Sequence, residues 1–533
     1  MIGFGEAAIA FYVPVFISFM VFNTMTGGVA CILALAAYFL WTKQVNEYWK
    51  SQGVPGPTPN FFFGNFLQMQ KGFHLYDIEN ARKYGPIYGG SVLGFRELNV
   101  CDVEMIKRIF IQEFPAFPER VMAEFFAGNQ RIRKNMINIL YGQRWKDLRR
   151  TVSPAFTPGR IQKILPLMSR CIQASESILD DCIKNSNGII DSKKFFCNFA
   201  MDVMAQCAFG VDLSTQKDQR ESEFVRYALK IFETPFVDSR IMFLVLFPNV
   251  MRLLEKTFNF QLIGNSCDAF FEGVLRRIIE ERRKNPYQVN HDFLQLLLDT
   301  SEGRTIAEED DELPDAIASG NKVALTEIEL LAQGYLFLAV GFQTTATILQ
   351  FATYSLASNP HVQEIAHDHI MEVAGNKEII EYEDLMKMPY IEQVMFETLR
   401  MYPPVPRSDR RCRSSTMVND IMIEKDTFVF VPTYAIHYDE RNYPNPQVFD
   451  PDRFSPTEKA KRDQFAYVPF GVGPRSCVGR RFGEIEIRLT LAYLLRKFRF
   501  SVPEEYLGKP LEIDTVGMTK AKWPTHMTVT RRN

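Results

Sequence analysis

One cysteine, Cys477, lies in a loop whose neighbours suit a sulfur anion. The run from 470 to 479 reads Phe-Gly-Val-Gly-Pro-Arg-Ser-Cys-Val-Gly, so Gly471, Gly473 and Gly479 surround the sulfur and Arg475 precedes it by two residues. Glycines permit tight turns and the close approach of a flat ligand, and backbone N–H groups can then point at the sulfur. A thiolate needs such stabilisation at neutral pH. The loop is therefore expected to hold an ionised Cys477.

The residues that follow the loop add to this expectation. From Arg480 to Leu489 the pattern is helical, which places the positive end of a helix dipole behind the sulfur. Arg475 is a permanent cation that can pair with an acidic group lying against the loop. A glycine-rich turn around an inert buried cysteine is the alternative interpretation.

The loop resembles the haem-binding segment Phe-x-x-Gly-x-Arg-x-Cys-x-Gly of the cytochrome P-450 haem-thiolate monooxygenases at every fixed position. In that family the cysteine thiolate ligates haem iron. The resemblance thus implies a haem b group with Cys477 as the axial ligand. It also implies that Phe470, Gly471, Arg475 and Gly479 lie against the haem.

Two further segments resemble a structural motif of the same family. Glu397-Thr398-Leu399-Arg400 places two charges three residues apart in a helical pattern, where they can pair. Pro451-Asp452-Arg453-Phe454 is similar to the family's Pro-Glu-Arg-Phe segment. The resemblance implies that Arg453 completes a triad with Glu397 and Arg400.

A third segment, Trp145-Lys146-Asp147-Leu148-Arg149, resembles the family's Trp-x-x-x-Arg helix, which contacts a haem propionate. By this resemblance Trp145, Arg149, Arg475 and Arg407 would pair with or fix the propionates. The chain order from Trp145 to Cys477 agrees with the family throughout. The sequence looks most like the microsomal animal group of drug-oxidising, insect detoxifying and thromboxane-synthase-like enzymes.

The segment from 339 to 345, Ala-Val-Gly-Phe-Gln-Thr-Thr, resembles the family's oxygen-activating segment with two departures. Gly341 would let the helix distort and make room for dioxygen, and Thr344 offers a hydroxyl for hydrogen bonding. Where the family has an acid that takes part in proton delivery, this chain has Gln343, which cannot ionise. Val340 likewise replaces a small residue above the expected haem plane.

The coarse pattern predicts a mainly α fold with small β-sheets, which is the cytochrome P-450 fold. Short strands are expected near 86 to 101 and at 427 to 431, with mostly helical periodicity between them up to about 410. The capping box Thr326-x-x-Glu329 starts a helix that runs to about Leu356 and is apolar nearly all round, hence buried. The acidic run at 308 to 312 is interpreted as a solvated loop.

Composition sets limits on the class of protein. The 533 residues are 46% apolar and carry a net charge of −2, which argues against a nucleic-acid-binding protein. Nine scattered cysteines do not form a disulfide framework, so a reducing compartment is expected for the catalytic part.

The N-terminus predicts a membrane anchor. Residues 7 to 22 and 29 to 41 are nearly all apolar, separated by the run from 23 to 28, and a spanning helix needs about 20 such residues. A cleaved signal peptide is the alternative, but no basic region begins the chain. Lys43 and Lys50 follow the apolar stretch, so the remaining chain is expected in the cytosol.

A stiff segment, Val54-Pro55-Gly56-Pro57-Thr58-Pro59, comes next and matches the proline-rich hinge of the microsomal enzymes. The expected organisation is an anchor at 1–42, a linker and hinge at 43–59, and one haem-thiolate catalytic domain at 60–533. The resemblance implies location in the endoplasmic reticulum membrane, with the catalytic domain facing the cytosol.

The expected activity is insertion of one oxygen atom into a lipophilic small molecule. The chain has no recognisable flavin or nicotinamide domain, so electrons from NADPH must come through a partner reductase, with cytochrome b5 as an optional second donor. Basic residues that could steer an acidic partner cluster near the thiolate side: Arg144, Lys146, Arg149, Arg150, Arg480 and Arg481.

The substrate is not defined by the sequence, although segments 117 to 140 and 230 to 262 are expected to line its pocket. Two alternatives to the monooxygenase remain open. One is a haem-thiolate isomerase that rearranges lipid peroxides without a reductase, motivated by Gln343 and Val340. The other is a haem-binding protein without turnover.

Overall fold

The computed structural model describes residues 24–121, 130–217, 222–232, 266–285, 292–302, 323–507, 511–522 and 526–532, with isolated positions between 247 and 257. The apolar stretch at 7 to 22, the acidic run at 308 to 312 and parts of both expected pocket segments lie outside these residues. The predictions made for them are therefore not addressed by the structure.

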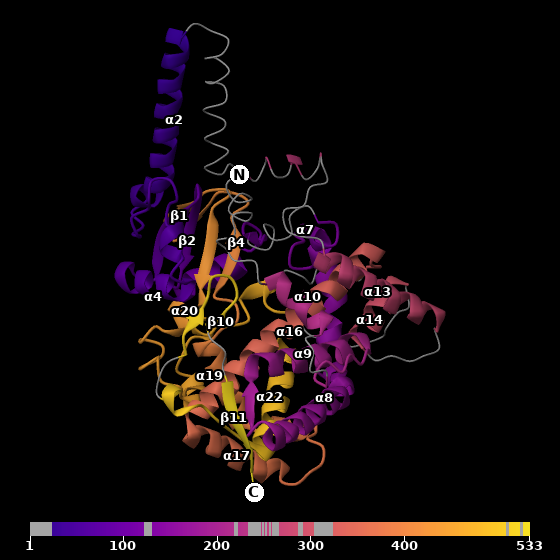
Figure 1. Ribbon diagram of the computed structural model, residues 1–533. Coiled ribbons are helices and arrows are strands. Elements are labelled where there is room, and N and C mark those ends of the chain that lie inside the picture. The colour runs from indigo at the N-terminus through magenta and orange to yellow at the C-terminus, as the bar shows by residue number, and fades with distance from the viewer. Residues whose placement is uncertain are drawn as a thin grey trace.

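Helices make up most of the described chain and form the lower mass in Figure 1. The longer ones are α2 (Thr24–Ser51), α4 (Phe73–Tyr84), α7 (Gly142–Val152), α8 (Pro158–Asn185), α9 (Ser192–Phe209), α10 (Glu223–Phe232), α13 (Ser266–Lys284), α14 (Phe293–Ser301), α16 (Glu327–Ser358), α17 (Pro360–Ala374), α19 (Pro389–Met401) and α22 (Arg480–Lys497). Short helices are α3 (Phe66–Met69), α5 (Val103–Lys107), α18 (Tyr382–Met386), α20 (Thr433–His437) and α21 (Pro456–Lys459).

The strands form small sheets, as the sequence predicted. The largest has the order β1-β2-β7-β4, from β1 (Ile87–Val92), β2 (Phe95–Val100), β7 (Phe428–Pro432) and β4 (Arg407–Arg411). A second joins β3 (Ile189–Asp191), β11 (His526–Arg531) and β8 (Phe498–Ser501). Two-stranded sheets pair β5 (Thr416–Val418) with β6 (Ile421–Ile423), and β9 (Ile513–Asp514) with β10 (Lys520–Ala521).

The expected strands near 86 to 101 and at 427 to 431 are confirmed as β1, β2 and β7. β1 and β2 pair as an antiparallel hairpin, and β2 continues in parallel with β7. β7 then pairs with β4 in antiparallel register, with Asp409 opposite Phe430. This sheet brings residues near 90 and near 410 into one layer beside the helical body (Figure 1).

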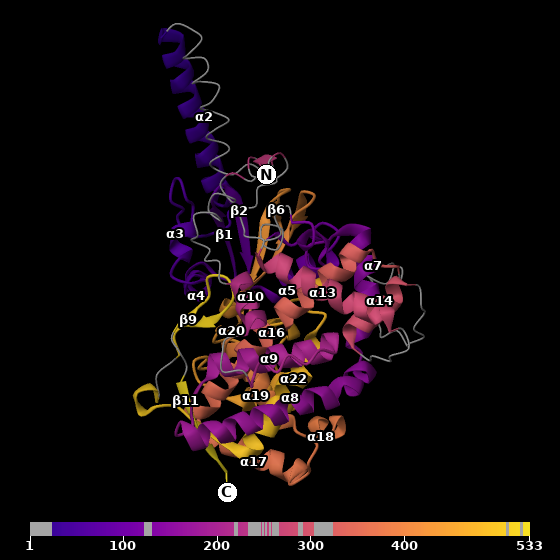
Figure 2. The ribbon, with the colours of Figure 1, turned by 45° about the vertical axis from the view of Figure 1, so that its right-hand side comes forward.

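The long buried helix is confirmed as α16, and its predicted capping box is present. Thr326 accepts a hydrogen bond from the backbone N–H of Glu329, whose carboxylate accepts one from the backbone of Thr326. The helix packs on α9, α19 and α22, and its residues belong to the main apolar core. Figure 2 shows α9, α16, α22 and α19 crossing in the middle of the body.

Among the described residues, the helix that is long and apolar enough to span a membrane by length and composition is α16, and 78% of that window is buried inside the protein. It is therefore a core helix. α2 instead projects from the body in Figure 1 and exposes Ile32, Leu33 and Leu40.

α2 differs from the sequence expectation at both ends. The residues from Thr24 to Gly28, interpreted as a break, lie within the helix, since glycine costs a long helix only about 1 kcal/mol. The helix also continues to Ser51, so its last residues fall in the segment expected as linker, and the domain boundary after 42 stays a prediction. The proline-rich hinge lies against β1: Gly89 donates to Pro55 O at 2.8 Å, and a Cβ on Gly56 would stand 2.0 Å from Gly89 O.

Candidate active site

The loop around Cys477 is a tight turn that only particular residues can form. Gly471 and Gly473 have φ values of +75° and +71°, which favour glycine. A Cβ on Gly473 would also lie 2.3 Å from the carbonyl oxygen of Phe110. The backbone N–H of Cys477 donates to Phe470 O at 2.9 Å, which closes the turn. The sequence pattern thus has a conformational cause.

The surroundings of the Cys477 sulfur act on the pKa of its thiol in two opposite directions. Burial among protein atoms raises the pKa of the thiol, although the side chain keeps an exposed surface. The backbone N–H of Gly479, Arg149 and Arg120 act in the other direction and favour the thiolate. Helix α22 begins directly after Gly479, so its N-terminal dipole adds to them. A positively charged metal ion would shift the balance further toward the thiolate.

Four arginines gather near this loop from separate elements: Arg120, Arg149, Arg410 and Arg475. Arg120 donates to the carbonyl oxygen of Arg475 at 2.5 Å. Arg475 donates to Leu140 O at 2.6 Å, and Arg410 donates to Val472 O at 3.2 Å. Their polar contacts are thus mainly with backbone oxygens.

The charges of these arginines are not matched by the protein around them. In the described part of the chain none of the four forms an ion pair, and the Nε atoms of Arg149, Arg410 and Arg475 are buried without a hydrogen-bond partner. Burial lowers the pKa of Arg149 to about 10 and of Arg410 to about 9. Burial, then Arg120, Arg410 and Arg149, lower the pKa of Arg475 well below its usual range.

A group of buried guanidinium ions with free N–H donors fits a ligand that carries carboxylates. Haem b carries two propionates, and a cysteine loop beside the arginines supplies a thiolate for its iron. The residues of this chain therefore fit the group that the sequence implied.

Trp145 lies where the sequence placed it, on α7 next to the arginines. The guanidinium of Arg475 stacks over its ring at 4.3 Å from the centroid. Such stacking orients an arginine while leaving its edge N–H groups available. Trp145 therefore holds Arg475 in place.

Arg407 occupies a different environment from the one expected. Its guanidinium donates to Asp77, with Nε at 2.8 Å from Oδ2, and its Nη1 lies 3.7 Å from Glu97 Oε2. These two carboxylates already match its charge, and they raise its pKa. Arg407 therefore belongs to a buried ion cluster under the sheet.

Arg410 and Arg120 hold the positions that the sequence interpretation missed. Arg407 and Arg410 lie three residues apart in β4, and residues an odd number apart in a strand point to opposite faces. Ser408 and Arg410 are two residues apart and therefore share a face of the strand. The Oγ atom of Ser408 lies 3.5 Å from a Cβ built on Gly471, so this face points toward the cysteine loop. Recognising β4 as a strand would have selected Arg410.

An exposed stripe on α16 faces this region. Between Glu329 and Ala357 the residues that are not buried are Phe337, Val340, Gly341 and Thr344. Their spacing of three and four residues puts them on one face of the helix. Val340 is 40% exposed, although the helix crosses the protein core. The stripe therefore borders an open interior, and it includes Thr344 and Gly341 of the expected oxygen-activating segment.

Thr344 and Gln343 differ in orientation. The hydroxyl of Thr344 donates to Val340 O at 3.0 Å and lies on the open face. Gln343 is buried, and its Oε1 has no hydrogen-bond partner in the described structure. Gly341 packs against α9, where a Cβ would lie 2.6 Å from Cε of Met204. Close packing is thus one reason for glycine there.

The three residues of the expected triad lie together. Arg400 donates to both carboxylate oxygens of Glu397 at 2.7 Å, and both side chains are fully buried. Nε of Arg453 lies 3.5 Å from Glu397 Oε1. Arg400 also donates to the carbonyl oxygens of His437 and Pro446, so the charges of Arg400 and Glu397 are matched within the protein.

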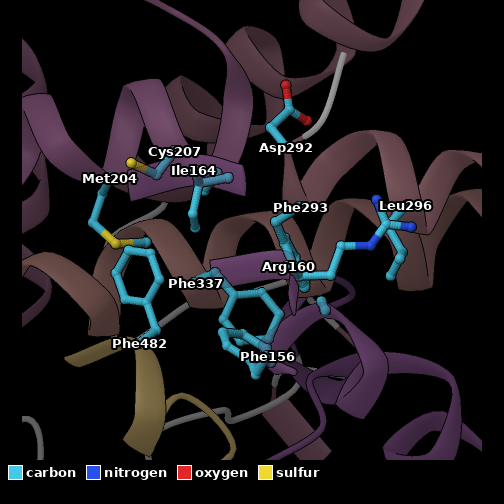
Figure 3. A pocket seen from close by; sticks show the side chains of 12 residues that line it. Phe156, Arg160, Ile164, Met204, Cys207, Asp292, Phe293, Leu296, Phe337 and Phe482 are labelled. Carbon is cyan, nitrogen blue, oxygen red and sulfur yellow. The ribbon is translucent and has the colours of Figure 1, made fainter. Parts of the chain in front are cut away.

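A small apolar cavity lies close to the cysteine loop (Figure 3). Its aromatic walls come from Phe156, Phe293, Phe337 and Phe482, and Figure 3 shows the first three close together, with Phe482 beside Met204. Phe156 also lies 3.7 Å from a Cβ built on Gly479. Arg160 and Asp292 add two charged groups to its lining.

The basic residues expected to steer a partner are partly committed. Arg144 pairs with Glu329, and Arg480 pairs with Glu484 at 2.7 Å. Arg149 belongs to the buried arginine group. Three of the six basic residues therefore already interact within the protein.

Comparisons with known proteins agree with this site. The family model described as Cytochrome P450 matches residues 54–525. Cytochrome P450 3A27 of Oncorhynchus mykiss is 32% identical over 524 residues, which cover 97% of this chain and 96% of that protein. Cytochrome P450 6k1 of Blattella germanica is 33% identical over 515 residues, covering 92% and 95%. Cytochrome P450 3A6 of Oryctolagus cuniculus is 30% identical over 503 residues, covering 94% and 96%.

Proposed function

The chain belongs to the cytochrome P450 family of haem-thiolate monooxygenases, and from this premise we propose that it inserts one oxygen atom of O2 into a lipophilic small molecule with electrons that a reductase passes on from NADPH. The observation that carries the proposal is the meeting of three features: a thiolate loop, buried arginines without carboxylate partners, and an open helix stripe that carries Thr344.

Cys477 would bind the iron, and Arg120, Arg149, Arg410 and Arg475 would bind the propionates. The bound haem supplies the oxidising chemistry, with electron density from the thiolate favouring O–O cleavage. Trp145 keeps Arg475 oriented by stacking, and Gly473 lets the loop approach Phe110 closely.

Thr344 is the polar side chain of the open stripe, so it is the group placed to hold a proton near the reacting atoms. Its hydroxyl donates to Val340 O and can turn toward a ligand at little cost. Phe337 and Val340, which share the stripe, exclude water and select an apolar substrate.

The proposed setting is the endoplasmic reticulum membrane with the catalytic domain in the cytosol. α2 exposes apolar residues along its projecting part, which suits contact with lipid. A substrate that partitions into lipid would then reach the protein from the membrane side. The reductase, with cytochrome b5 as a second donor, would approach the thiolate side.

Ligation is tested by the spectrum of the reduced protein with carbon monoxide. We expect the red-shifted Soret band of a thiolate-ligated haem, and its loss in Cys477→Ala. Cys412→Ala is the matched control, because Cys412 is buried in the core beside the sheet. A mutant Cys477→Ala that keeps the band would refute the assignment.

A peroxide isomerase is the second candidate, favoured by the non-ionisable Gln343. Turnover of apolar substrates with NADPH and reductase should be compared with turnover of a lipid hydroperoxide without an electron donor. Reductase-dependent product supports the monooxygenase. Product from the hydroperoxide alone supports the isomerase, and a normal Soret band without either product indicates a haem-binding protein without turnover.

A further inference from the structure

A buried carboxyl group on α22, that of Glu486, contacts the segment of α16 that is expected to activate oxygen. Glu486 is 1% exposed, and its Oε2 accepts a hydrogen bond from the hydroxyl of Thr345 at 3.2 Å. Its other oxygen, Oε1, is buried without a partner in the described structure. Thr345 directly follows Thr344, so the carboxyl is linked to the residue next to the open stripe.

Glu486 has no cation to pair with. The described residues place no Lys or Arg within ion-pair distance of it. Among the helices packed around it, the titratable groups that face it are Cys171 of α8 and Cys207 of α9, since its charge raises the pKa of both thiols. Burial raises the pKa of Glu486 to about 8, against the opposing hydrogen bond from Thr345.

A carboxyl in this environment keeps its proton at neutral pH, because ionising it would leave an unpaired charge inside the protein. The neutral carboxylic acid can donate a hydrogen bond and can also release its proton. The amide of Gln343 can donate a hydrogen bond but does not release a proton. The chain therefore has an acid near the threonine pair, but at a position distant in sequence from 343.

We propose that Glu486 is a positioning residue of the monooxygenase reaction, which holds a transferable proton for the Thr344–Thr345 pair in place of the carboxyl that is missing at 343. Once the Thr345 hydroxyl turns so that its Oγ1 accepts, the O–H bond of Glu486 breaks and its proton passes to Thr345 Oγ1. The hydroxyl proton of Thr345 passes to a water molecule, which gives one of its own protons to the reacting atoms beside Thr344 and stays neutral. Glu486 is then a carboxylate and regains a proton from solvent water, so the protons consumed by the reaction come from water. This inference rests on the proposed monooxygenase function.

The test compares wild type, Glu486→Gln, Gln343→Glu and the double variant, each as haem-loaded protein with reductase. The measured quantity is product formed per NADPH oxidised, as a function of pH. Glu486→Gln should lower it by at least about tenfold at pH 7, because a positioned proton donor typically contributes about 10²–10⁴-fold. The wild-type value should fall as pH rises through about 8, and the profile of the variant should be flat.

Restoring a carboxyl at the other position separates proton supply from structure. The double variant should recover to within about threefold of wild type, because Gln343→Glu supplies an acid where Glu486→Gln removed one. Thr345→Val, which keeps the carboxyl but breaks its link, should repeat the loss. Glu176→Gln is the control: it is a mostly buried carboxyl with one unpartnered oxygen, but it pairs with Lys497.

A readout without turnover completes the test. Infrared difference spectra of wild type should show the C=O stretch of a protonated carboxyl, absent in Glu486→Gln, titrating near pH 8. Coupling that is unchanged in Glu486→Gln, or a loss that Gln343→Glu does not repair in protein with a normal thiolate Soret band, overturns the inference. A wild type without reductase-dependent product would instead overturn the proposed function itself.

Discussion

Two groups of buried arginines in this protein differ in how their charges are matched. In the first, Glu397, Arg400 and Arg453 form a closed cluster, in which Glu397 receives two hydrogen bonds at 2.7 Å and Arg400 also binds backbone oxygens. In the second, near Cys477, Arg149, Arg410 and Arg475 form no ion pair in the described structure, and burial lowers the pKa of each.

The difference separates a structural element from a binding site. A buried ion pair with full hydrogen bonding is self-sufficient, and removing one partner leaves an uncompensated charge. In the second group the charge of Asp409 offsets part of the charge of Arg410 and Arg475, but the described residues form no ion pair with them. Such a group of like charges is costly in the protein alone and becomes favourable when an anionic ligand enters. The arginines near Cys477 therefore indicate where the protein binds an anionic ligand.

The largest expected effect follows from breaking the closed cluster. Glu397→Ala leaves Arg400 buried without a counterion, so the free energy of unfolding should fall by about 3–5 kcal/mol. Thermal unfolding and haem content per protein measure this, and little haem should be bound. The control is Glu458→Ala, because Glu458 and Lys461 have the same i,i+3 spacing but are exposed.

Normal haem content and unchanged thermal stability in Glu397→Ala would show that the two arginine groups do not differ as described. Loss of stability in Glu458→Ala of the same size would show that position in the sequence motif, rather than burial, decides the effect.

A second variant tests the placement of Arg407 among the matched arginines. Asp77→Asn removes one of its two carboxylate partners, so the free energy of unfolding should fall by about 3 kcal/mol. The Soret band and the haem content of the folded fraction should not change, because Arg407 is not needed for the propionates. A spectral change without loss of stability would return Arg407 to the haem site.

The sequence predicted the parts of this site that depend on neighbouring residues. The turn around Cys477 requires glycines at fixed positions, the capping box of α16 involves residues three apart, and Glu397 and Arg400 lie on one helix face. All of these are local, and the sequence pattern contains the cause of each.

Features that need tertiary contacts were not accessible in the same way. Arg410 could be distinguished from Arg407 only by knowing that β4 is a strand, whose alternation sends them to opposite faces. The role proposed for Glu486 depends on its hydrogen bond with Thr345, which lies 141 residues away in the chain. Nothing in the sequence indicated that Glu486 is buried, since α22 begins with exposed charged residues and becomes buried only from Ile485 onward.

A third prediction extends the comparison to an unmatched carboxyl. Unlike an arginine, Glu486 can become neutral by keeping its proton, and burial raises its pKa to about 8 from an unfolded value of about 4.3. Between these values the folded state holds one more proton than the unfolded state, so the free energy of unfolding falls as pH rises, by up to about 1.4 kcal/mol per unit.

Glu486→Gln should remove this slope. Denaturant unfolding between pH 5 and 7 should then show a difference from wild type that grows by about 2 kcal/mol in favour of the variant. Parallel pH profiles for the two proteins would mean that Glu486 ionises normally and is not protonated at neutral pH.

The smallest expected effect is a change in stability caused by Arg410→Met, which should have opposite signs in the haem-free and the haem-loaded protein. Arg410→Met replaces an unmatched buried cation by an apolar side chain, so the haem-free protein should gain about 1 kcal/mol in the free energy of unfolding, net of two lost hydrogen bonds to backbone oxygens. The haem-loaded protein should lose stability, because a propionate then lacks its guanidinium partner, and transfer of haem to an acceptor protein should become faster. Thermal unfolding of both forms, together with the rate of haem transfer, measures the two signs.

Arg400→Met is the contrasting variant, which should destabilise both forms since its carboxylate partner is already in the protein. A mutant Arg410→Met that destabilises the haem-free protein as much as Arg400→Met does would mean that the two groups of arginines are both structural, and that the unmatched charges near Cys477 do not mark the ligand site.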